Sequence, residues 1–249
     1  MNAHATTLAT ALALIALAPA TAPAQNSEAS FLTDYSKLQT AKDNPFDEIY
    51  ASPEGIKRAA QYDSIMIDQP ELFIHPDSKY KGMKPDDMKA LADSLRESVT
   101  AQLKGGYKIV DKPGPNVLYV RLAVGDLLLQ KKKRPILAYI PVGAVVYGVK
   151  NLASEATSKI DLKNMKIEGE VLDSVSQEQF GAVTSSRGSL SAAASDPNKP
   201  VSWKELDNLF SIVGKRLRCR LDNSRIPEAQ WAKCGAIGLA PEPTKSAAR

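Results

Sequence analysis

The sequence predicts an α+β fold, built as a two-layer antiparallel or mixed sheet with two amphipathic helices packed on one face. Two long segments carry apolar residues at helical spacing, and several shorter segments alternate apolar and polar residues as strands do. No internal repeat of fixed period is present. With 249 residues and 43% hydrophobic residues, the chain can bury a globular core.

Residues 1–24 have the pattern of a secretory signal peptide. The apolar run Thr7–Ala18 is shorter than the roughly 20 residues that span a bilayer. Ala22-Pro23-Ala24 then precedes Gln25, which places a signal cleavage site between Ala24 and Gln25. The alternative is a buried N-terminal helix, which the lack of a polar face disfavours. We therefore expect a periplasmic protein.

Three further regions follow the signal segment. Residues 25–60 are expected to be irregular, because Asn44-Pro45 and Ser52-Pro53 are typical of turns. An α+β domain is expected over residues 61–225 and a C-terminal tail over residues 226–249. The first strand of the domain is expected in the Tyr62–Ile74 segment, where apolar and polar residues alternate.

Two helices are predicted. The first begins at Pro85, which suits a first helical turn, and ends at Gly105-Gly106. Its apolar stripe consists of Met88, Leu91, Ala92, Leu95, Val99 and Leu103. The second covers Trp203–Leu221, with the stripe Leu206, Phe210, Val213, Leu217 and Leu221. Its basic residues are expected on a solvated face: Lys215, Arg216, Arg218 and Arg220.

The remaining strands are expected over Tyr107–Val110, Val117–Leu129, Leu162–Asp173 and Gln179–Ser186. The last two segments are predicted to form an antiparallel hairpin across a polar turn. Along Val117–Leu129 the apolar residues alternate with a second set, so that each set lies on its own face of the sheet. One set is Leu118, Val120, Leu122 and Val124, and the other is Tyr119, Arg121 and Ala123.

Charge and cysteine content narrow the function. The chain has 32 basic and 28 acidic residues, and a net charge of +4 gives no reason to expect nucleic acid as a partner. In an oxidising compartment Cys219 and Cys234 are expected to form a disulfide, with two free buried thiols as the alternative. Two cysteines without a nearby histidine cannot complete a zinc site. We expect neither a metal nor a cofactor.

A catalytic site is not expected. The sequence contains no G-x-S-x-G, P-loop or G-x-G-x-x-G motif. His75 with Asp77, near Asp68 and Glu71, is a candidate acid–base group for an unrecognised hydrolase. The favoured interpretation is that His75 ends a strand through a hydrogen bond. The protein is therefore predicted not to be an enzyme.

Two surfaces are candidates for binding. Phe31, Asp34 and Tyr35 could anchor a partner, although we favour a segment that folds back and covers an apolar face of the sheet. Lys131, Lys132, Lys133 and Arg134 precede the apolar stretch Ile136–Leu152 and could bind an anionic membrane surface or another subunit. The alternative for this second region is a solvated basic turn before a buried helix.

Several short motifs resemble a bacterial envelope family of unknown function, DUF3313. They include Phe31–Leu38, which is similar to a FLxDYSxL signature, together with His75-Pro76-Asp77 and Val110–Pro115. The resemblance implies a two-layer α+β domain, and many members look like lipoproteins. This chain lacks a cysteine at the cleavage site, so we do not expect lipid anchoring to the outer membrane. We expect a non-enzymatic envelope component that binds a protein partner or assembles with itself, and the alternative is a peripheral membrane-binding module.

Overall fold

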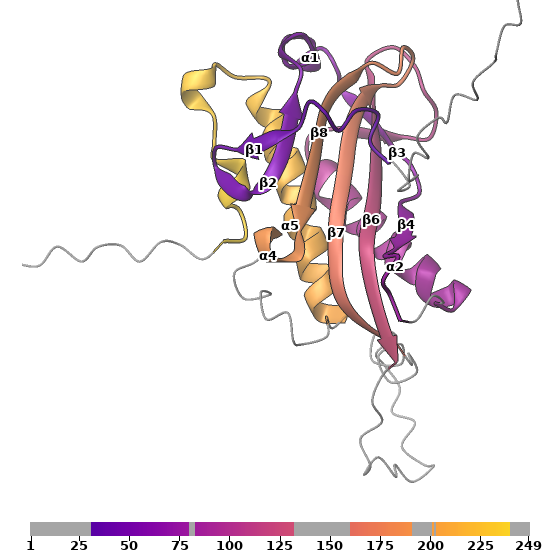
Figure 1. Ribbon diagram of the computed structural model, residues 1–249. Helices are drawn as coiled ribbons and strands as arrows, with labels where there is room; N and C mark the ends of the chain where they lie inside the picture. Colours follow the sequence, from indigo (N-terminus) through magenta and orange to yellow (C-terminus); the bar gives the residue numbers. More distant parts are fainter. Residues whose placement is uncertain (1–30, 80–82, 132–159, 191–200, 202, 240–249) are drawn as a thin grey trace, which may run out of the picture. The chain divides into compact units, whose positions relative to one another are not determined.

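The computed structural model describes residues 31–79, 83–131, 160–190, 201 and 203–239. Within them lies a mixed eight-stranded sheet of order β1-β2-β8-β7-β6-β3-β5, in which β4 also pairs with β6 (Figure 1). The strands are β1 (Gln39–Ala41), β2 (Asn44–Ala51), β3 (Ser64–Ile67), β4 (Glu71–Ile74), β5 (Lys108–Val110), β6 (Val117–Lys131), β7 (Ile160–Asp173) and β8 (Gln179–Ser186). The helical segments are α1 (Pro53–Ala59), α2 (Pro85–Leu103), α4 (Arg187–Leu190), α5 (Trp203–Asn223), η2 (Glu228–Gln230) and η3 (Cys234–Ala236).

The middle of the sheet is antiparallel and one side of it is parallel. Strands β6, β7, β8 and β2 pair antiparallel in turn, and the predicted β7–β8 hairpin is confirmed. Strands β3 and β4 pair parallel with β6, and β5 pairs parallel with β3. Helix α2 connects this parallel part, as a parallel connection requires. The predicted α+β class with a mixed sheet is therefore confirmed.

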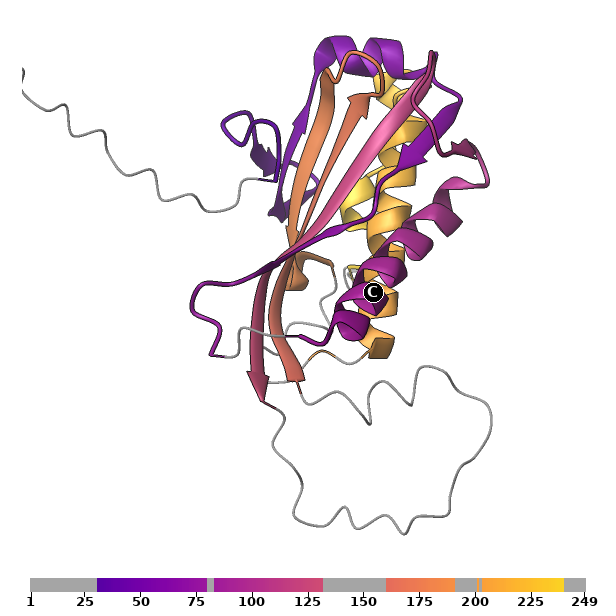
Figure 2. The same cartoon turned by 90° about the vertical axis from the view of Figure 1, so that its right-hand side faces the viewer.

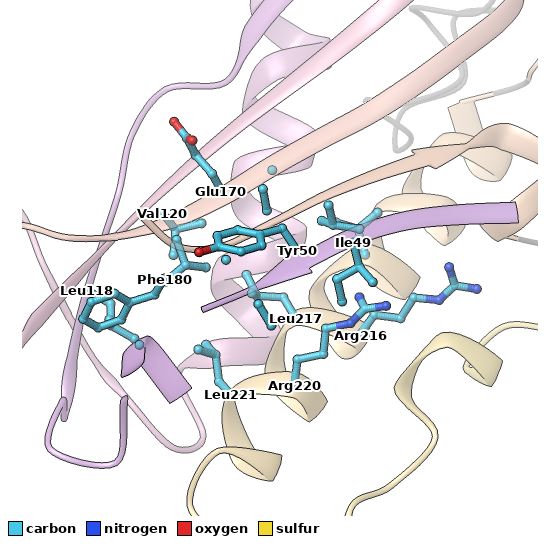
Figure 3. A pocket seen from close by; sticks show the side chains of 18 of the residues that line it. Ile49, Tyr50, Leu118, Val120, Glu170, Phe180, Arg216, Leu217, Arg220 and Leu221 are labelled. Carbon is cyan, nitrogen blue, oxygen red and sulfur yellow. The ribbon is translucent and has the colours of Figure 1, made fainter. Parts of the chain in front are cut away.

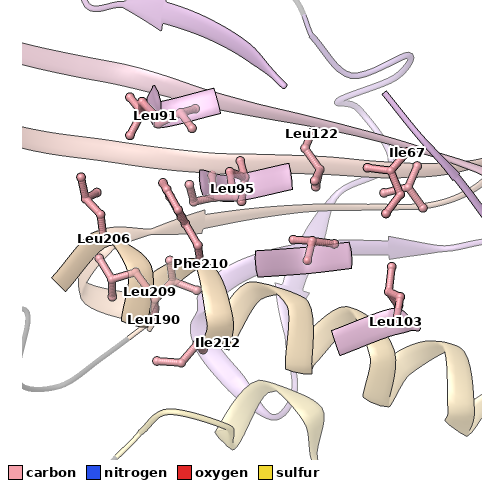
Figure 4. Packing of buried hydrophobic residues seen from close by; sticks show 14 of the residues in the cluster. Ile67, Leu91, Leu95, Leu103, Leu122, Leu190, Leu206, Leu209, Phe210 and Ile212 are labelled. Atoms are coloured by element: carbon pink, nitrogen blue, oxygen red, sulfur yellow. The ribbon is translucent and has the colours of Figure 1, made fainter. Parts of the chain in front are cut away.

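Helices α2 and α5 lie together on one face of the sheet, which we call the helix face (Figure 2). Gly214 of α5 allows a close approach, because a Cβ there would lie 3.0 Å from the Val99 Cα of α2. Both predicted stripes enter the same core, which the sheet completes with the predicted inward set of β6 (Figure 4). Among the described residues, every helix is too short or too polar to cross a bilayer.

The expectation that residues 25–60 are irregular is wrong for the described part of that region. Strands β1 and β2 extend the sheet, and α1 follows directly. Ser52-Pro53 is a helix start rather than a turn: the Ser52 side chain accepts a hydrogen bond from the Gly55 amide at 3.1 Å, and Pro53 occupies the first turn. Serine at the N-cap and proline in the first turn are both typical of a helix start, and the same dipeptide is also common in turns.

Two other boundaries differ from expectation. The segment Tyr62–Ile74 forms two strands, because Pro70 lies between β3 and β4 and proline cannot continue a ladder of backbone hydrogen bonds. In the described part of the expected tail, residues 226–233 are exposed, whereas Cys234 and Gly235 are buried. Its short helix η3 contacts both α5 and β2.

Candidate functional site

A cavity of about 130 Å³ lies between the sheet on one side and helices α1 and α5 on the other (Figure 3). We call it the α5 cavity. Its walls come from β2, β6, β7 and β8, from α1, and from one face of α5. The α5 residues that line it are Val213, Arg216, Leu217, Arg220 and Leu221, and Ser224 lines it just beyond the helix. Their three- and four-residue spacing places them on one side of the helix.

Small residues on the sheet and on α1 form part of the cavity wall. Gly169 of β7 faces the cavity, and a Cβ there would lie 3.2 Å from Leu122 Cδ2. On α1, Gly55 packs so closely on Phe180 that a Cβ would lie 2.9 Å from the Phe180 Cα, and Ala59 lines the cavity one turn later. Both glycines therefore allow their neighbours to pack closely at the wall of the cavity.

One end of the cavity carries positive charge. Arg216 and Arg220 lie on the side of Ile49, away from Leu118 and Phe180 (Figure 3). Arg216 is 1% exposed and all three of its guanidinium nitrogens donate hydrogen bonds. The acceptors are Asp47 Oδ2 at 3.0 Å, the Ser189 carbonyl at 2.7 Å and the Ile237 carbonyl at 2.9 Å.

Arg220 is different, because its Nη2 is buried and has no hydrogen-bond partner among the described residues. Asp47 Oδ2 lies 3.8 Å from this nitrogen, which is close enough for electrostatic attraction but too far for a hydrogen bond. Burial lowers the pKa of the Arg220 guanidinium, and attraction to Asp47 and Asp43 offsets only part of this effect. Burial likewise lowers the pKa of Arg216. The cavity thus has an apolar body and two guanidinium groups at one end, one of which has a buried donor without a hydrogen bond among the described residues.

The opposite face of the sheet is covered by residues 31–38, which we call the N-terminal strap (Figure 1). Phe31 and Leu32 are each 3% exposed and pack with Ala123 and Ala182. The segment with Phe31, Asp34 and Tyr35 thus folds back over an apolar face of the sheet, as favoured from the sequence. Asp34 is only partly exposed and lies beside Lys37. A role of these residues in partner binding stays a prediction.

A buried acidic pair holds the strap. Glu170 Oε2 accepts a hydrogen bond from the Thr33 amide at 3.0 Å, and Glu170 Oε1 accepts one from Arg121 at 2.6 Å. The Tyr35 hydroxyl donates to Glu168 Oε1 at 3.1 Å. The Arg121 guanidinium also lies 4.8 Å from the Phe31 ring centroid, a cation–π distance. These contacts have a structural role.

The candidate acid–base residues take part in other contacts. His75 Nδ1 accepts a hydrogen bond from the Asp77 amide at 3.0 Å, as expected for a strand end. Asp68 accepts one from the Tyr119 hydroxyl at 2.6 Å, and Glu71 pairs with Arg121 at 3.1 Å. No group of three or more metal-ligating side chains occurs in the described ranges.

The predicted disulfide between Cys219 and Cys234 is confirmed, with the two Cα atoms 5.6 Å apart. It fastens α5 to the segment that carries η3.

Three other predicted sites lie outside the described residues. They are the cleavage site at Ala24 and Gln25, the basic residues Lys132, Lys133 and Arg134, and the apolar stretch 136–152.

The placement of Arg216 and Arg220 corrects the expectation that the basic residues of this helix are solvated. Arg216 is fully buried and Arg220 is partly buried. The sequence did contain a signal: Arg216 stands three residues after Val213 and directly before Leu217, inside the apolar stripe. Lys215, by contrast, is exposed as expected.

The fold and the site define a two-layer α+β domain with an apolar, cation-ended cavity between the layers. The chain belongs to a family of proteins of unknown function, DUF3313, whose model matches residues 27–217. No curated protein matches the chain significantly.

Three solved structures are similar to parts of the chain. A dodecamer of a PelC variant from Paraburkholderia phytofirmans is 13% identical over 66% of this chain and 96% of its own, with a TM-score of 0.30. A putative neuraminyllactose-binding hemagglutinin homolog from Helicobacter pylori is 12% identical over 66% and 85%, with a TM-score of 0.33. Protein XCC0632 from Xanthomonas campestris is 13% identical over 67% and 86%, with a TM-score of 0.25. The likeness is too loose for any functional argument.

Proposed function

We propose that this protein is a non-enzymatic component of the bacterial cell envelope that binds an apolar group of its ligand in the α5 cavity. The cavity itself is the observation that supports this function. Apolar cavities of about 150 Å³ hold a benzene ring in other proteins, so 130 Å³ has room for a ring or a short alkyl segment. Val213 and Leu217 are partly exposed, which provides a path from the surface.

Export is part of the proposal and rests on two independent features. Residues 1–24 have the pattern of a signal peptide, and Cys219 and Cys234 are disulfide-bonded, which is typical of oxidising compartments. N-terminal sequencing of the protein from a periplasmic fraction should begin at Gln25. Recovery of the uncleaved chain from the cytoplasm would contradict export.

Binding is tested with 1-hexanol, a neutral probe whose alkyl chain is short enough for the cavity. We expect saturable amide chemical-shift changes in the NMR spectrum, centred on Val213, Leu217 and Val183. Val213→Phe fills the cavity and should abolish these changes. Val175→Phe is the matched control, because Val175 is 66% exposed in the β7–β8 turn, and it should leave them intact.

Two outcomes would contradict a binding function for the cavity. One is the absence of any saturable shift in the wild-type protein. The other is undiminished binding by Val213→Phe, which would place the probe elsewhere. A thermal unfolding curve for each variant shows whether the protein is folded, and the phenylalanine is expected to keep or raise the midpoint by filling empty space.

Association with an envelope protein or with a second copy of the chain remains part of the same proposal. An apolar side chain of a partner could occupy the cavity as an alkyl chain would. A native pull-down from envelope extract, together with the mass in solution, tests this element. Recovery of a monomer alone would count against it.

A further inference from the structure

We infer that the ligand of the α5 cavity is an amphipathic organic anion, whose apolar chain or ring occupies the cavity and whose oxyanion binds Arg220. This inference rests on the proposed function, since it assigns the ligand class of the same cavity. An anionic ligand can bind in the cavity only if one of the two arginines has a hydrogen-bond donor that is not already used. Their hydrogen bonds distinguish them.

Arg216 is already occupied. Its three donors are directed to Asp47, Ser189 and Ile237, and its side chain is 2% exposed. It links α5 to β2 and to the residues around α4 and η3. Removal of Arg216 would leave three acceptors without this donor, so its role is structural.

The Arg220 side chain is partly exposed to solvent, and one of its hydrogen-bond donors has no acceptor. Its side chain is 21% exposed, yet its Nη2 is buried without a hydrogen-bond partner in the described part of the chain. A buried donor without an acceptor is energetically unfavourable. A carboxylate or phosphate oxygen would supply the acceptor, and such charge-assisted hydrogen bonds are among the stronger ones in proteins.

Two carboxylate oxygens near Arg220 already accept hydrogen bonds from other groups. Asp47 Oδ2 accepts hydrogen bonds from Arg216 at 3.0 Å and from the side-chain Nδ2 of Asn44 at 3.2 Å. Asp43 Oδ2 accepts one from the Gly235 amide at 2.6 Å. Asp47 Oδ1 is buried without a donor and is the internal competitor for Arg220. If this competitor captured Arg220, the cavity would show no preference for anions.

The geometry also fixes how the ligand lies. The guanidinium groups are at the Ile49 end, and the opposite end is lined by Leu118 and Phe180 (Figure 3). A chain with its oxyanion at Arg220 therefore extends toward Phe180 and places its tail among apolar side chains. A neutral chain could occupy the same space but would leave the Arg220 donor unpaired.

The test compares three probes with the same six-carbon chain: hexanoate, hexyl phosphate and 1-hexanol. NMR titration of the oxidised protein should give Kd values for the two anions about tenfold below that of the alcohol. Arg220→Met keeps an unbranched side chain and should remove this preference while changing the alcohol Kd by less than about twofold. Hexanoate and hexyl phosphate distinguish a carboxylate ligand from a phosphate ligand.

Lys215→Met, on the exposed side of the same helix, is the matched control and should retain the preference for anions. Equal Kd values for all three probes would overturn the inference and leave the proposed function standing. Failure of all three probes to bind would overturn both. An anion preference that survives in Arg220→Met would also overturn the inference, because it would assign the charge recognition to another group.

Discussion

The two faces of the sheet are covered in different ways. The helix face carries two long helices, a continuous apolar core and the α5 cavity. The opposite face of the sheet, which we call the outer face, carries the N-terminal strap with a cluster of four buried apolar residues. It also carries a set of charged hydrogen bonds through Glu168, Glu170 and Arg121. The helix face therefore supplies most of the apolar burial, whereas the outer face relies on specific polar contacts. The two should respond differently to matched substitutions.

The largest expected effect compares one phenylalanine on each face. Phe210 is fully buried between the helices and the sheet, so Phe210→Ala should lower the free energy of unfolding by about 3–5 kcal/mol. Phe31→Ala should cost less, because the strap can detach locally instead of enclosing a rigid void. Urea denaturation measures both losses. Equal losses, without faster hydrogen exchange in residues 31–38, would show that the strap belongs to the main cooperative unit.

The second effect concerns how α5 is anchored. The disulfide closes a loop with a sequence separation of 15 residues, for which the chain-entropy model gives about 3 kcal/mol of stabilisation. The double variant Cys219→Ser/Cys234→Ser should lose about that amount in urea denaturation. Reduction of the wild-type protein should give the same loss. A variant as stable as the oxidised protein would show that the bond does not constrain the helix layer.

The third effect separates a buried from an exposed ion pair on the outer face, using two partners of the same arginine. Glu170→Gln removes a carboxylate that is 0% exposed, and we expect a loss of about 2 kcal/mol. Glu71→Gln removes one that is 50% exposed, and we expect less than about 1 kcal/mol. Thermal unfolding measures both. Similar losses would mean that the strap does not depend on the buried acid.

The smallest effect lies at the β7–β8 turn, where the two faces meet. Burial tends to raise the pKa of Asp173, but hydrogen bonds from the Tyr62 hydroxyl and from the Ser176 and Val175 amides lower it to about 2. Because the pKa is lower in the folded protein, this stabilisation is present above about pH 4 and is lost as the pH falls toward 2.

Asp173→Asn should therefore reduce stability by about 1 kcal/mol at pH 6, with a gap to the wild type that narrows toward pH 2.5. Urea denaturation at both pH values measures the gap. Asp77→Asn, at an 89% exposed side chain, is the control and should show no gap at either pH. A constant gap for Asp173→Asn would refute the ionic origin of the effect.

The helix face could be predicted from sequence far better than the edge of the sheet that β1 and β2 form. The stripes of α2 and α5 and the alternation in β6 depend on local periodicity, and each entered the core as expected. The pairing of β1 and β2 with the sheet depends on contacts with β8, at least 130 residues later in the chain, for which no local pattern exists. Ser52-Pro53 shows a different failure, because one dipeptide is compatible with both a turn and a helix start.

The cavity was not visible in the sequence for a related reason. Its walls come from α1, α5 and several strands that meet only in the folded chain, and no local pattern marks a glycine such as Gly169 as part of a cavity wall. Arg216 and Arg220 were assigned to a solvated face because positive charge near a helix C-terminus is favourable in any case. The distinction between a buried and a solvated arginine needed the position of Asp47, a residue of β2.

A crystal structure of the oxidised protein with hexyl phosphate would show directly whether the α5 cavity binds an amphipathic anion. We expect an alkyl chain between α5 and the sheet, with its end toward Phe180 and a phosphate oxygen within hydrogen-bond distance of Arg220 Nη2. A probe bound elsewhere, or a cavity closed by Arg220 paired to Asp47 Oδ1, would contradict it.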